Sequence, residues 1–283
     1  MSTGDSQKDG EGRISWHPAF LEAMRLELEQ YGDRLEFKPE YQLTSESLRI
    51  DLLIIKKPKN LVITKNIAAI FRETNIIEYK SPDDYVSVED FYKVYGYACL
   101  YIALNKTPVT DITITFVENR YPRNLTGYLK TVRRFDIEES GPGIYTVRGD
   151  AIPIQIIEGR RLPAEENAWL RDLDHGLDPA ELIRISTKID RLGKAANIGA
   201  YTEALFRANS AALREVLTMS DAAVTLEKVF EETGLIRKWE ARGEAQSKAE
   251  VAKKLISMGL PLGQVAEATG LDPEFLTALP NNR

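Results

Sequence analysis

The chain is poor in the residues that build thiolate and imidazole metal sites. Its 283 residues include one cysteine, Cys99, and two histidines, His17 and His175. A single cysteine excludes an internal disulfide and a thiolate metal cluster, and two histidines make a histidine-based zinc site hard to build. Any metal ion bound by this chain is therefore expected to have oxygen ligands.

Long apolar runs are also missing. No apolar run approaches the roughly 20 residues that a membrane helix needs. The first 13 residues are rich in Gly, Ser, Asp and Lys and lack the apolar stretch of a secretory signal, so residues 1–13 are expected to form a disordered tail. The sequence predicts a cytoplasmic protein without a membrane-spanning segment.

An excess of positive charge is absent as well. The formal net charge is −6, which argues against a protein that coats nucleic acid non-specifically. The charge is nevertheless uneven, because one segment without acids contains Arg120, Arg123, Lys130, Arg133 and Arg134. A second positive stretch contains Lys56, Lys57, Lys59 and Lys65. These side chains could neutralise the phosphates of DNA, but solvated lysines in a loop explain the pattern equally well.

The apolar periodicity of the first 160 residues predicts a layered fold. The expected elements are a helix over 17–31, strands over 35–43, 48–55 and 75–80, a helix over 87–104 opened by a capping box at Ser87 and Asp90, a strand over 110–117, a helix over 122–134, and a hairpin of strands over 144–147 and 152–157. This order indicates an α/β or α+β domain at 14–160, with a mixed central sheet between helices.

The remainder of the chain has helical patterns. Residues 161–250 are expected to form a helical region, and residues 251–283 contain short helices joined by tight turns that resemble a helix-turn-helix. This last segment offers acids where base-reading helices usually offer basic or amide side chains. A role in packing, or in a homo-oligomer formed through the helical half, is therefore preferred to DNA reading.

The candidate catalytic residues lie on two predicted strands. Asp51 lies inside the apolar run 48–55, and Glu78-Tyr79-Lys80 closes the run 75–80. Because side chains alternate along a strand, Glu78 and Lys80 project from one side and Tyr79 from the other. If the two strands pair, two carboxylates converge beside a lysine. In the alternative interpretation, Glu78 and Lys80 form a surface ion pair and Asp51 caps a turn.

A Mg²⁺-dependent phosphodiester hydrolase requires such a convergence. Asp51, Glu78 and the backbone carbonyl of Tyr79 would be sufficient protein ligands for Mg²⁺, or for Mn²⁺ in its place. Lys80 would orient the attacking water or help to deprotonate it. Glu27 is the acid on the first helix that is expected to reach inward toward the sheet, so it is a further candidate ligand.

The segments 49–57, 75–82 and 90–98, which contain Asp51, Glu78 and Lys80, resemble the PD-(D/E)XK nuclease superfamily. Within it they resemble the bacterial recombination-promoting nucleases and transposase-associated proteins, and residues 259–271 are similar to the tail of many of those proteins. The resemblance implies a restriction-endonuclease-like core and a metal-dependent DNA endonuclease. Asp51 and Glu78 would be the metal-binding acids, Lys80 the catalytic lysine, and Glu27 or its rival Glu40 the helix-borne acid.

The chain departs from the superfamily pattern in two places. Ile50 occupies the position of the proline, which does not affect metal binding. The helix after the motif is expected to offer no polar side chain to the site, because Lys93 and Tyr97 fall outside its buried stripe. This leaves the phosphate contacts of the site unassigned, and the candidate DNA-binding residues are Arg120, Arg123, Lys130 and Arg133. The competing hypothesis is a nuclease-fold protein without turnover that serves as an assembly or regulatory module.

Overall fold

The structure is a computed structural model that describes residues 14–39, 52–193, 198–235, 237, 247–253, 256, 262–272 and 276. Asp51 and Glu40 lie outside the described residues. The chain forms two compact units, Met1–Leu226 and Glu227–Arg283. The first unit contains the sheet, and it runs well past residue 160, the boundary expected from the sequence.

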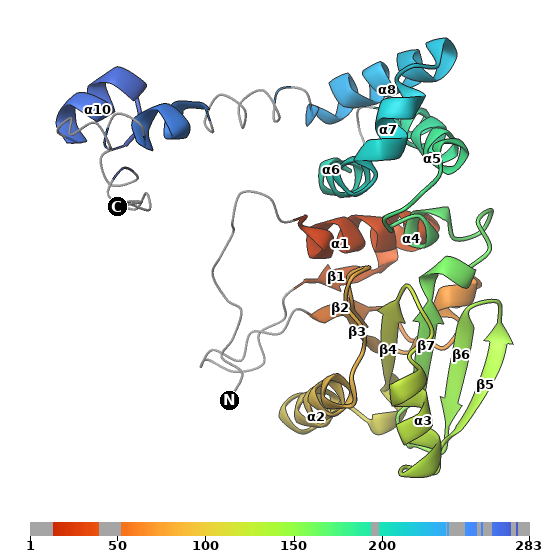
Figure 1. Cartoon of the computed structure of the whole chain (residues 1–283). Coiled ribbons are helices and arrows are strands. Elements are labelled where there is room, and N and C mark those ends of the chain that lie inside the picture. Colours follow the sequence, from red (N-terminus) through yellow and green to blue (C-terminus); the bar gives the residue numbers. More distant parts are fainter. Residues whose placement is uncertain are drawn as a thin grey trace. The chain divides into compact units, whose positions relative to one another are not determined.

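In the described part of the chain, seven strands form one mixed sheet in the order β1-β2-β3-β4-β7-β6-β5 (Figure 1). The strands are β1 (Glu36–Lys38), β2 (Leu52–Lys56), β3 (Thr74–Tyr79), β4 (Ile112–Glu118), β5 (Asp136–Gly141), β6 (Ile144–Arg148) and β7 (Ile154–Glu158). β4 pairs in parallel with both β3 and β7, and the other neighbours are antiparallel. The expected mixed α/β architecture is confirmed.

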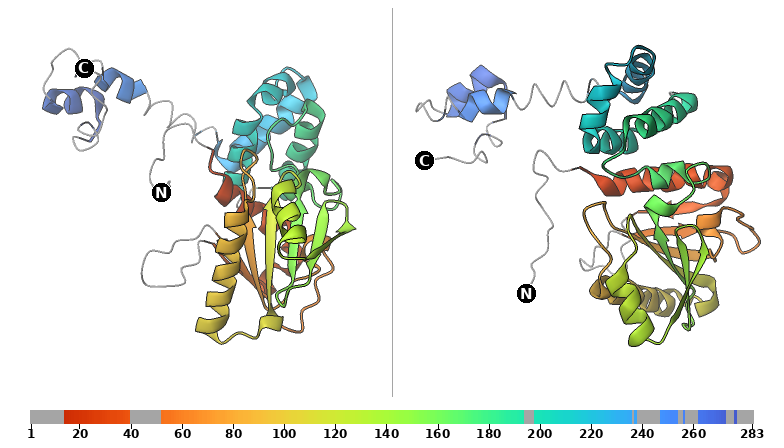
Figure 2. Two further views of the ribbon diagram at one scale, coloured as in Figure 1. Left: turned by 60° about the horizontal axis from the view of Figure 1, so that its bottom comes forward. Right: turned by 45° about the vertical axis from the view of Figure 1, so that its right-hand side comes forward.

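Helices cover both faces of this sheet (Figure 2). On one face, α2 (Val88–Asn105) and α3 (Arg123–Thr131) contribute Phe91 and Leu125 to a core that includes Ile76 of β3 and Phe116 of β4. On the other face, Phe20 of α1 (Trp16–Glu27) stacks on Tyr79 with ring centroids 4.2 Å apart. The alternation along β3 therefore places Glu78 on the α2 side and Tyr79 on the α1 side.

A helical layer extends the first unit beyond α1. It consists of α4 (Ala168–Arg171), α5 (Pro179–Leu192), α6 (Gly199–Ala208) and α7 (Ser210–Val216), and α8 (Ser220–Thr233) crosses the boundary between the units. The backbone N–H of Tyr201 in α6 donates to Glu22 of α1 at 2.6 Å, and the Tyr201 ring contacts Trp169 of α4 edge to face. These contacts explain why the helices after residue 160 belong to the same compact unit as the sheet.

The second unit is small. Its described residues include α10 (Leu262–Thr269) and a core of Ala252, Val265 and Leu276. α10 ends before Gly270, whose φ of 68° lies in the left-handed region that favours glycine. Across the described residues, no helix is both long enough and apolar enough to cross a membrane.

β5 and α4 were not expected from the sequence. β5 is an edge strand whose side chains are mostly exposed and largely acidic, so it shows little apolar alternation. α4 has four residues, which is too short for a periodic pattern. By contrast, the hairpin of β6 and β7 and the capping box that opens α2 are confirmed.

Candidate functional site

The carboxyl ends of β3 and β4 bring two acids to one edge of the sheet. Glu78 pairs in register with Phe116, and Glu118 is the last residue of β4. Because the strands are parallel, their carboxyl ends meet, and alternation puts Phe116 and Glu118 on the α2 side with Glu78. The backbone N–H of Lys80 donates to the carbonyl of Val117 at 2.9 Å, which continues the pairing beyond Tyr79.

Lys80 lies at the centre of an acid–lysine cluster formed by Glu78, Lys80, Asp84, Asp90 and Glu118. Its Nζ is 2.9 Å from Asp90 Oδ1, 3.5 Å from Glu78 Oε1 and 3.6 Å from Asp84 Oδ2. Burial alone would lower the pKa of Lys80, but the contacts with these carboxylates outweigh it and raise the pKa. Lys80 is therefore a protonated donor at neutral pH rather than a general base.

Asp90 is held in place by the capping box of α2. The Ser87 backbone N–H and hydroxyl donate to Asp90 Oδ2 at 3.0 and 2.7 Å, and the Asp90 N–H donates to Ser87 Oγ at 3.0 Å. Burial raises the pKa of Asp90, but these bonds and the Lys80 ammonium lower it further, so the net shift is downward. The helix start thus fixes the partner that orients Lys80.

Glu78 is a buried carboxylate with an unused oxygen. Its exposed fraction is 4%, and burial raises its pKa to about 7 although the Lys80 and Lys93 charges oppose the shift. Oε2 has no hydrogen-bond partner among the described residues. Because nearly all buried polar atoms find a partner, an orphaned carboxylate oxygen fits a bound cation at this position.

Glu118 has the same character, and sequence reasoning missed it. Its exposed fraction is 2%, Oε2 accepts from the Val86 N–H at 3.2 Å, and Oε1 has no partner among the described residues. Burial raises its pKa to about 8. The signal that could have revealed it is topological, since two parallel strands joined by one helix end at the same edge of a sheet.

The expectation that α2 offers no polar side chain to the cluster is wrong. Tyr97 is buried, and burial together with the nearby Glu78 carboxylate raises its pKa. The charge of the exposed Lys93 acts on Glu78 in turn. The buried arc of α2 is wider than the expected stripe, because Tyr97 follows Val94 by three residues and precedes Tyr101 by four.

The structure does not bring Glu27 to the cluster. Glu27 ends α1, which covers the face of the sheet opposite to Glu78. Its Oε2 lies 2.5 Å from Lys65 Nζ, and its Oε1 accepts from the Leu170 N–H at 3.0 Å. Glu27 is thus engaged in a buried contact on the other side of the sheet.

Of the other expected metal ligands, Tyr79 is among the described residues and Asp51 is not. Leu52, the neighbour of Asp51, pairs with Glu78 across β2 and β3. Tyr79 ends β3, so its backbone carbonyl is at the cluster's edge of the sheet, while burial against the α1 side raises the pKa of its phenol. Within the described ranges, no three His, Cys, Asp or Glu side chains form a metal-holding group.

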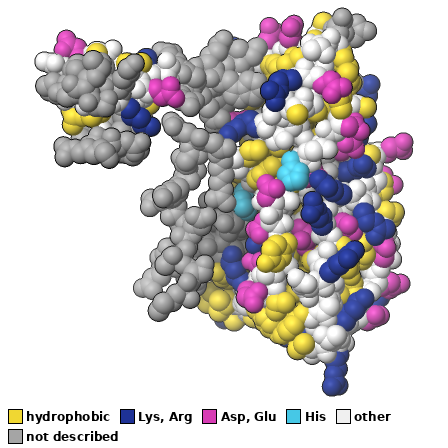
Figure 3. Space-filling model, in the orientation of Figure 1, with side chains coloured by type: hydrophobic (Ala, Val, Ile, Leu, Met, Phe, Trp, Pro, Cys, Tyr) yellow, Lys and Arg dark blue, Asp and Glu magenta, His cyan; other side chains and the backbone are white. Residues whose placement is uncertain are grey.

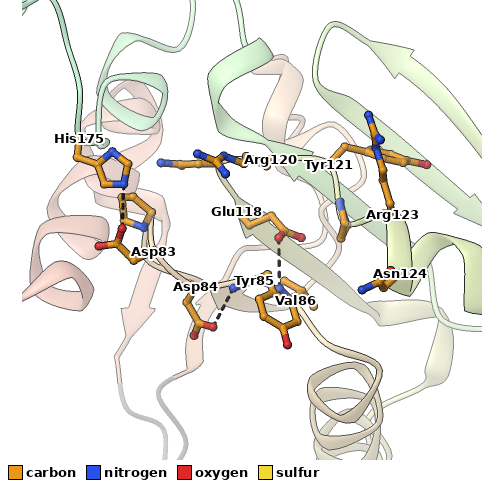
Figure 4. A pocket seen from close by; sticks show the side chains of 13 residues that line it. Asp83, Asp84, Tyr85, Val86, Glu118, Arg120, Tyr121, Arg123, Asn124 and His175 are labelled. Atoms are coloured by element: carbon orange, nitrogen blue, oxygen red, sulfur yellow. Dashed lines mark hydrogen bonds and ion pairs between the residues drawn. The ribbon is translucent and has the colours of Figure 1, made fainter.

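The four basic residues expected to contact DNA have different environments. Arg133 pairs with Asp150, with Nη2 3.3 Å from Oδ2, and its Cζ lies 4.9 Å from the centroid of the Phe135 ring. The structure therefore gives Arg133 a packing role. Lys130 is exposed near the end of α3. Arg120 and Arg123 line a pocket of about 400 Å³ beside the cluster (Figure 4).

The face drawn in Figure 3 has both acidic and basic side chains, so no surface of one sign covers the whole of it. The fold and the cluster together define a mixed α/β protein whose parallel strands end in buried acids around a lysine. Comparisons with protein-family models, with curated proteins and with solved structures found no match.

Proposed function

We propose that this chain is a Mg²⁺-dependent DNA endonuclease of the PD-(D/E)XK type, acting in the cytoplasm, with Mn²⁺ as a substitute ion. The observation that carries the proposal is the pairing of Glu78, in β3, with Lys80, just after it, while Glu78 Oε2 is buried and has no hydrogen-bond partner among the described residues. The donor set consists of carboxylate and carbonyl oxygens, which are the ligands that Mg²⁺ prefers.

Each residue of the site then has a distinct role. Bound Mg²⁺ would neutralise phosphate charge and activate a water molecule. Asp51, Glu78 and the Tyr79 carbonyl would hold the ion. Lys80, which keeps its proton, would donate a hydrogen bond to the scissile phosphate or to the attacking water, and Asp90 would position Lys80.

The register of β2 and β3 sets a condition for Asp51. Opposite residues of an antiparallel pair share a face, and position 52 is opposite Glu78. An unbroken strand would therefore place position 51 opposite Tyr79, on the other face. The proposal requires the strand to bend or bulge between positions 51 and 52, and a crystal structure grown with Mn²⁺ checks this requirement directly.

The activity test uses the full chain with supercoiled and linear DNA in Mg²⁺ or Mn²⁺. The wild-type protein should nick or cut DNA, and Asp51→Ala, Glu78→Gln and Lys80→Ala should each reduce the rate by at least about 100-fold, because each removes a ligand or the phosphate donor. Glu138→Gln is the matched control, since Glu138 is an exposed acid that pairs with Arg148 on the edge strand. Full activity in both Glu78→Gln and Lys80→Ala would falsify the assignment.

A second candidate function is an assembly or regulatory module with a nuclease fold but without turnover, joined into a homo-oligomer by its helical half. The observation in its favour is that the shortest contact of Lys80 is with Asp90, so the cluster also works as a structural ion-pair network. Calorimetry separates the two functions. Binding of Mg²⁺ or Mn²⁺ that is lost in Glu78→Gln supports the nuclease, and no binding by the wild-type protein favours the module.

A further inference from the structure

The pocket beside the acid–lysine cluster has walls of opposite charge. The loop after Lys80 forms one wall with Asp83, Asp84 and Tyr85, and the segment from Glu118 to Asn124 forms the other, with His175 at the rim. Figure 4 shows the Glu118 carboxyl group between the two walls and Arg120 extending toward His175. A volume of about 400 Å³ is at the small end of the range for ligand pockets.

The acids of the pocket already have partners. Asp83 Oδ1 lies 2.9 Å from His175 Nε2, Asp84 Oδ2 lies 3.6 Å from Lys80 Nζ, and Glu118 Oε2 accepts from the Val86 N–H. By contrast, Arg120 and Arg123 form no ion pair within the residues that the structure describes. Two other arginines, Arg160 and Arg161, are both paired with acids. Arg120 and Arg123 are therefore the cationic side chains of the pocket that are available to an anionic ligand.

The start of α3 adds an anion-binding feature to the same wall. Pro122 is the N-cap residue and supplies no side-chain hydrogen bond, and the first turn contains no acid. The first helical position is instead Arg123, which is unfavourable next to the positive end of a helix unless an anion is bound there. Backbone N–H groups at a helix start are a common phosphate site.

The floor of the pocket supplies an independent indication of a ligand. Glu118 Oε1 is buried and has no hydrogen-bond partner among the described residues. Tyr85 lines the opposite wall and is 63% exposed, so its ring is accessible to a ligand in the pocket. A ligand with a phosphate, a polar edge and a flat ring would satisfy the arginines, Glu118 and Tyr85 together.

We propose that this pocket binds one unpaired nucleotide of the DNA strand, with its phosphate at Arg120, Arg123 and the start of α3, its base on Tyr85, and a polar group at Glu118 Oε1. An unpaired base can stack on an aromatic side chain, whereas a base inside a duplex is already stacked on its neighbours and cannot. The inference rests on the proposed function, and it assigns to that function a substrate class, namely DNA with a single-stranded end, flap or branch.

The test measures binding in EDTA, where no hydrolysis occurs, by fluorescence anisotropy of the full chain. The probes are a 12-nucleotide single strand, a duplex with a single-stranded overhang and a blunt duplex of the same sequence. The single strand and the overhang should bind at least about 10-fold more tightly than the blunt duplex. Equal or tighter binding of the blunt duplex overturns the proposal.

Variants separate the pocket from general electrostatics. Arg120→Gln with Arg123→Gln should weaken single-strand binding by about 10-fold, and Glu118→Leu and Tyr85→Ala should weaken it without removing a positive charge. The control Arg148→Gln removes one positive charge, half of what the arginine pair loses, from an exposed ion pair with Glu138, and it should change binding less than 2-fold. Equal losses in Arg148→Gln and in the arginine pair overturn the proposal, provided circular dichroism shows both variants folded.

Competition identifies the recognised group. A deoxynucleoside monophosphate should displace the single strand at concentrations where inorganic phosphate does not, and equal displacement by both overturns the nucleotide assignment.

Failure of the binding tests can be distinguished from failure of the activity test. A chain that binds single strands but does not hydrolyse them retains this pocket and loses only the nuclease function, whereas a chain that cuts blunt duplexes and single strands equally retains only the nuclease function.

Discussion

Glu27 and Glu78 show how the partners of a buried carboxylate decide its role. Both side chains are 4% exposed. Neither Glu27 Oε2 nor Glu78 Oε2 has a hydrogen bond among the described residues. Glu27 Oε2 nevertheless lies 2.5 Å from Lys65 Nζ, and its Oε1 accepts from the Leu170 N–H, whereas Glu78 contacts Lys80 through Oε1 alone. Each oxygen of Glu27 therefore faces a protein donor or cation, and one oxygen of Glu78 remains for a bound cation.

Glu27→Gln should therefore destabilise the fold and leave cleavage nearly intact. Removing one partner of a buried ion pair leaves the other charge uncompensated, here Lys65, which is expected to lower the free energy of unfolding by about 3 kcal/mol. Urea denaturation followed by tryptophan fluorescence measures the loss, and the cleavage rate should remain within about 3-fold of wild type. A folded Glu27→Gln protein that is as inactive as Glu78→Gln would restore Glu27 as a metal ligand.

The turn between β5 and β6 depends on a glycine for two reasons. Gly143 has a φ of 73°, and a Cβ atom there would lie 2.7 Å from the Glu158 carbonyl oxygen and 3.0 Å from the Arg161 backbone. The left-handed conformation costs about 1–2 kcal/mol for a residue with a Cβ atom, and the contact with backbone cannot be relieved by a rotamer change.

Gly143→Ala should thus lower the free energy of unfolding by about 2 kcal/mol or more, which corresponds to a fall of about 5 °C or more in the midpoint of thermal unfolding. Gly127→Ala is the matched control, because Gly127 is inside α3 and has no atom within 4 Å of the position of a Cβ. There the substitution should be neutral or stabilising by up to about 1 kcal/mol. Equal midpoints for the two variants would contradict the close approach at Gly143.

Elements with strong apolar patterns could be predicted from the sequence, and elements defined by their neighbours could not. β3 and β4 are buried at every residue, so each forms a largely apolar run in the sequence, and α2 has a buried stripe at helical spacing. β5 forms because the edge of β6 offers backbone hydrogen bonds to it. The side chains of β5 are mostly exposed. Pairing of this kind leaves little signal in the strand itself.

The same division applies to the site. Glu78 and Lys80 could be found because residues that are two apart on a strand project from the same face. Asp84, Asp90 and Glu118 join them through a loop, a helix cap and a parallel neighbour, none of which follows from the alternation of side chains along a strand. The placement of Glu27 failed for a related reason. Periodicity shows which side of a helix is buried, but it does not show which face of the sheet that helix covers.

At the scale of the whole molecule, two buried acids with raised pKa values make stability depend on pH. The folded protein holds a proton on Glu78 up to about pH 7 and on Glu118 up to about pH 8, whereas an unfolded chain releases both near the ordinary value of 4.5. Between these limits the folded state binds more protons than the unfolded state. The free energy of unfolding therefore falls as the pH rises from about 4.5 toward 8.

Urea denaturation of the full chain in EDTA at pH 5, 6, 7 and 8 tests this dependence. Each group contributes a slope of at most about 1.4 kcal/mol per pH unit. Glu118→Gln should show a shallower decline than wild type and should be the more stable protein at pH 8, because the amide has no proton to lose. Glu138→Gln, at an exposed position, should follow the wild-type curve. Parallel curves for wild type and Glu118→Gln would show that Glu118 ionises normally in the folded protein.

The alternation of Glu78 and Tyr79 along β3 makes the length of that strand a constraint in its own right. A single-residue insertion or deletion before Glu78 reverses the phase of every later side chain in the strand. The carboxylate would then meet Phe20 and the α1 helix, and the phenol ring would occupy the space around Lys80. Homologues with the same chemistry are therefore expected to vary the length of the loops on either side of β3 while conserving the spacing within it.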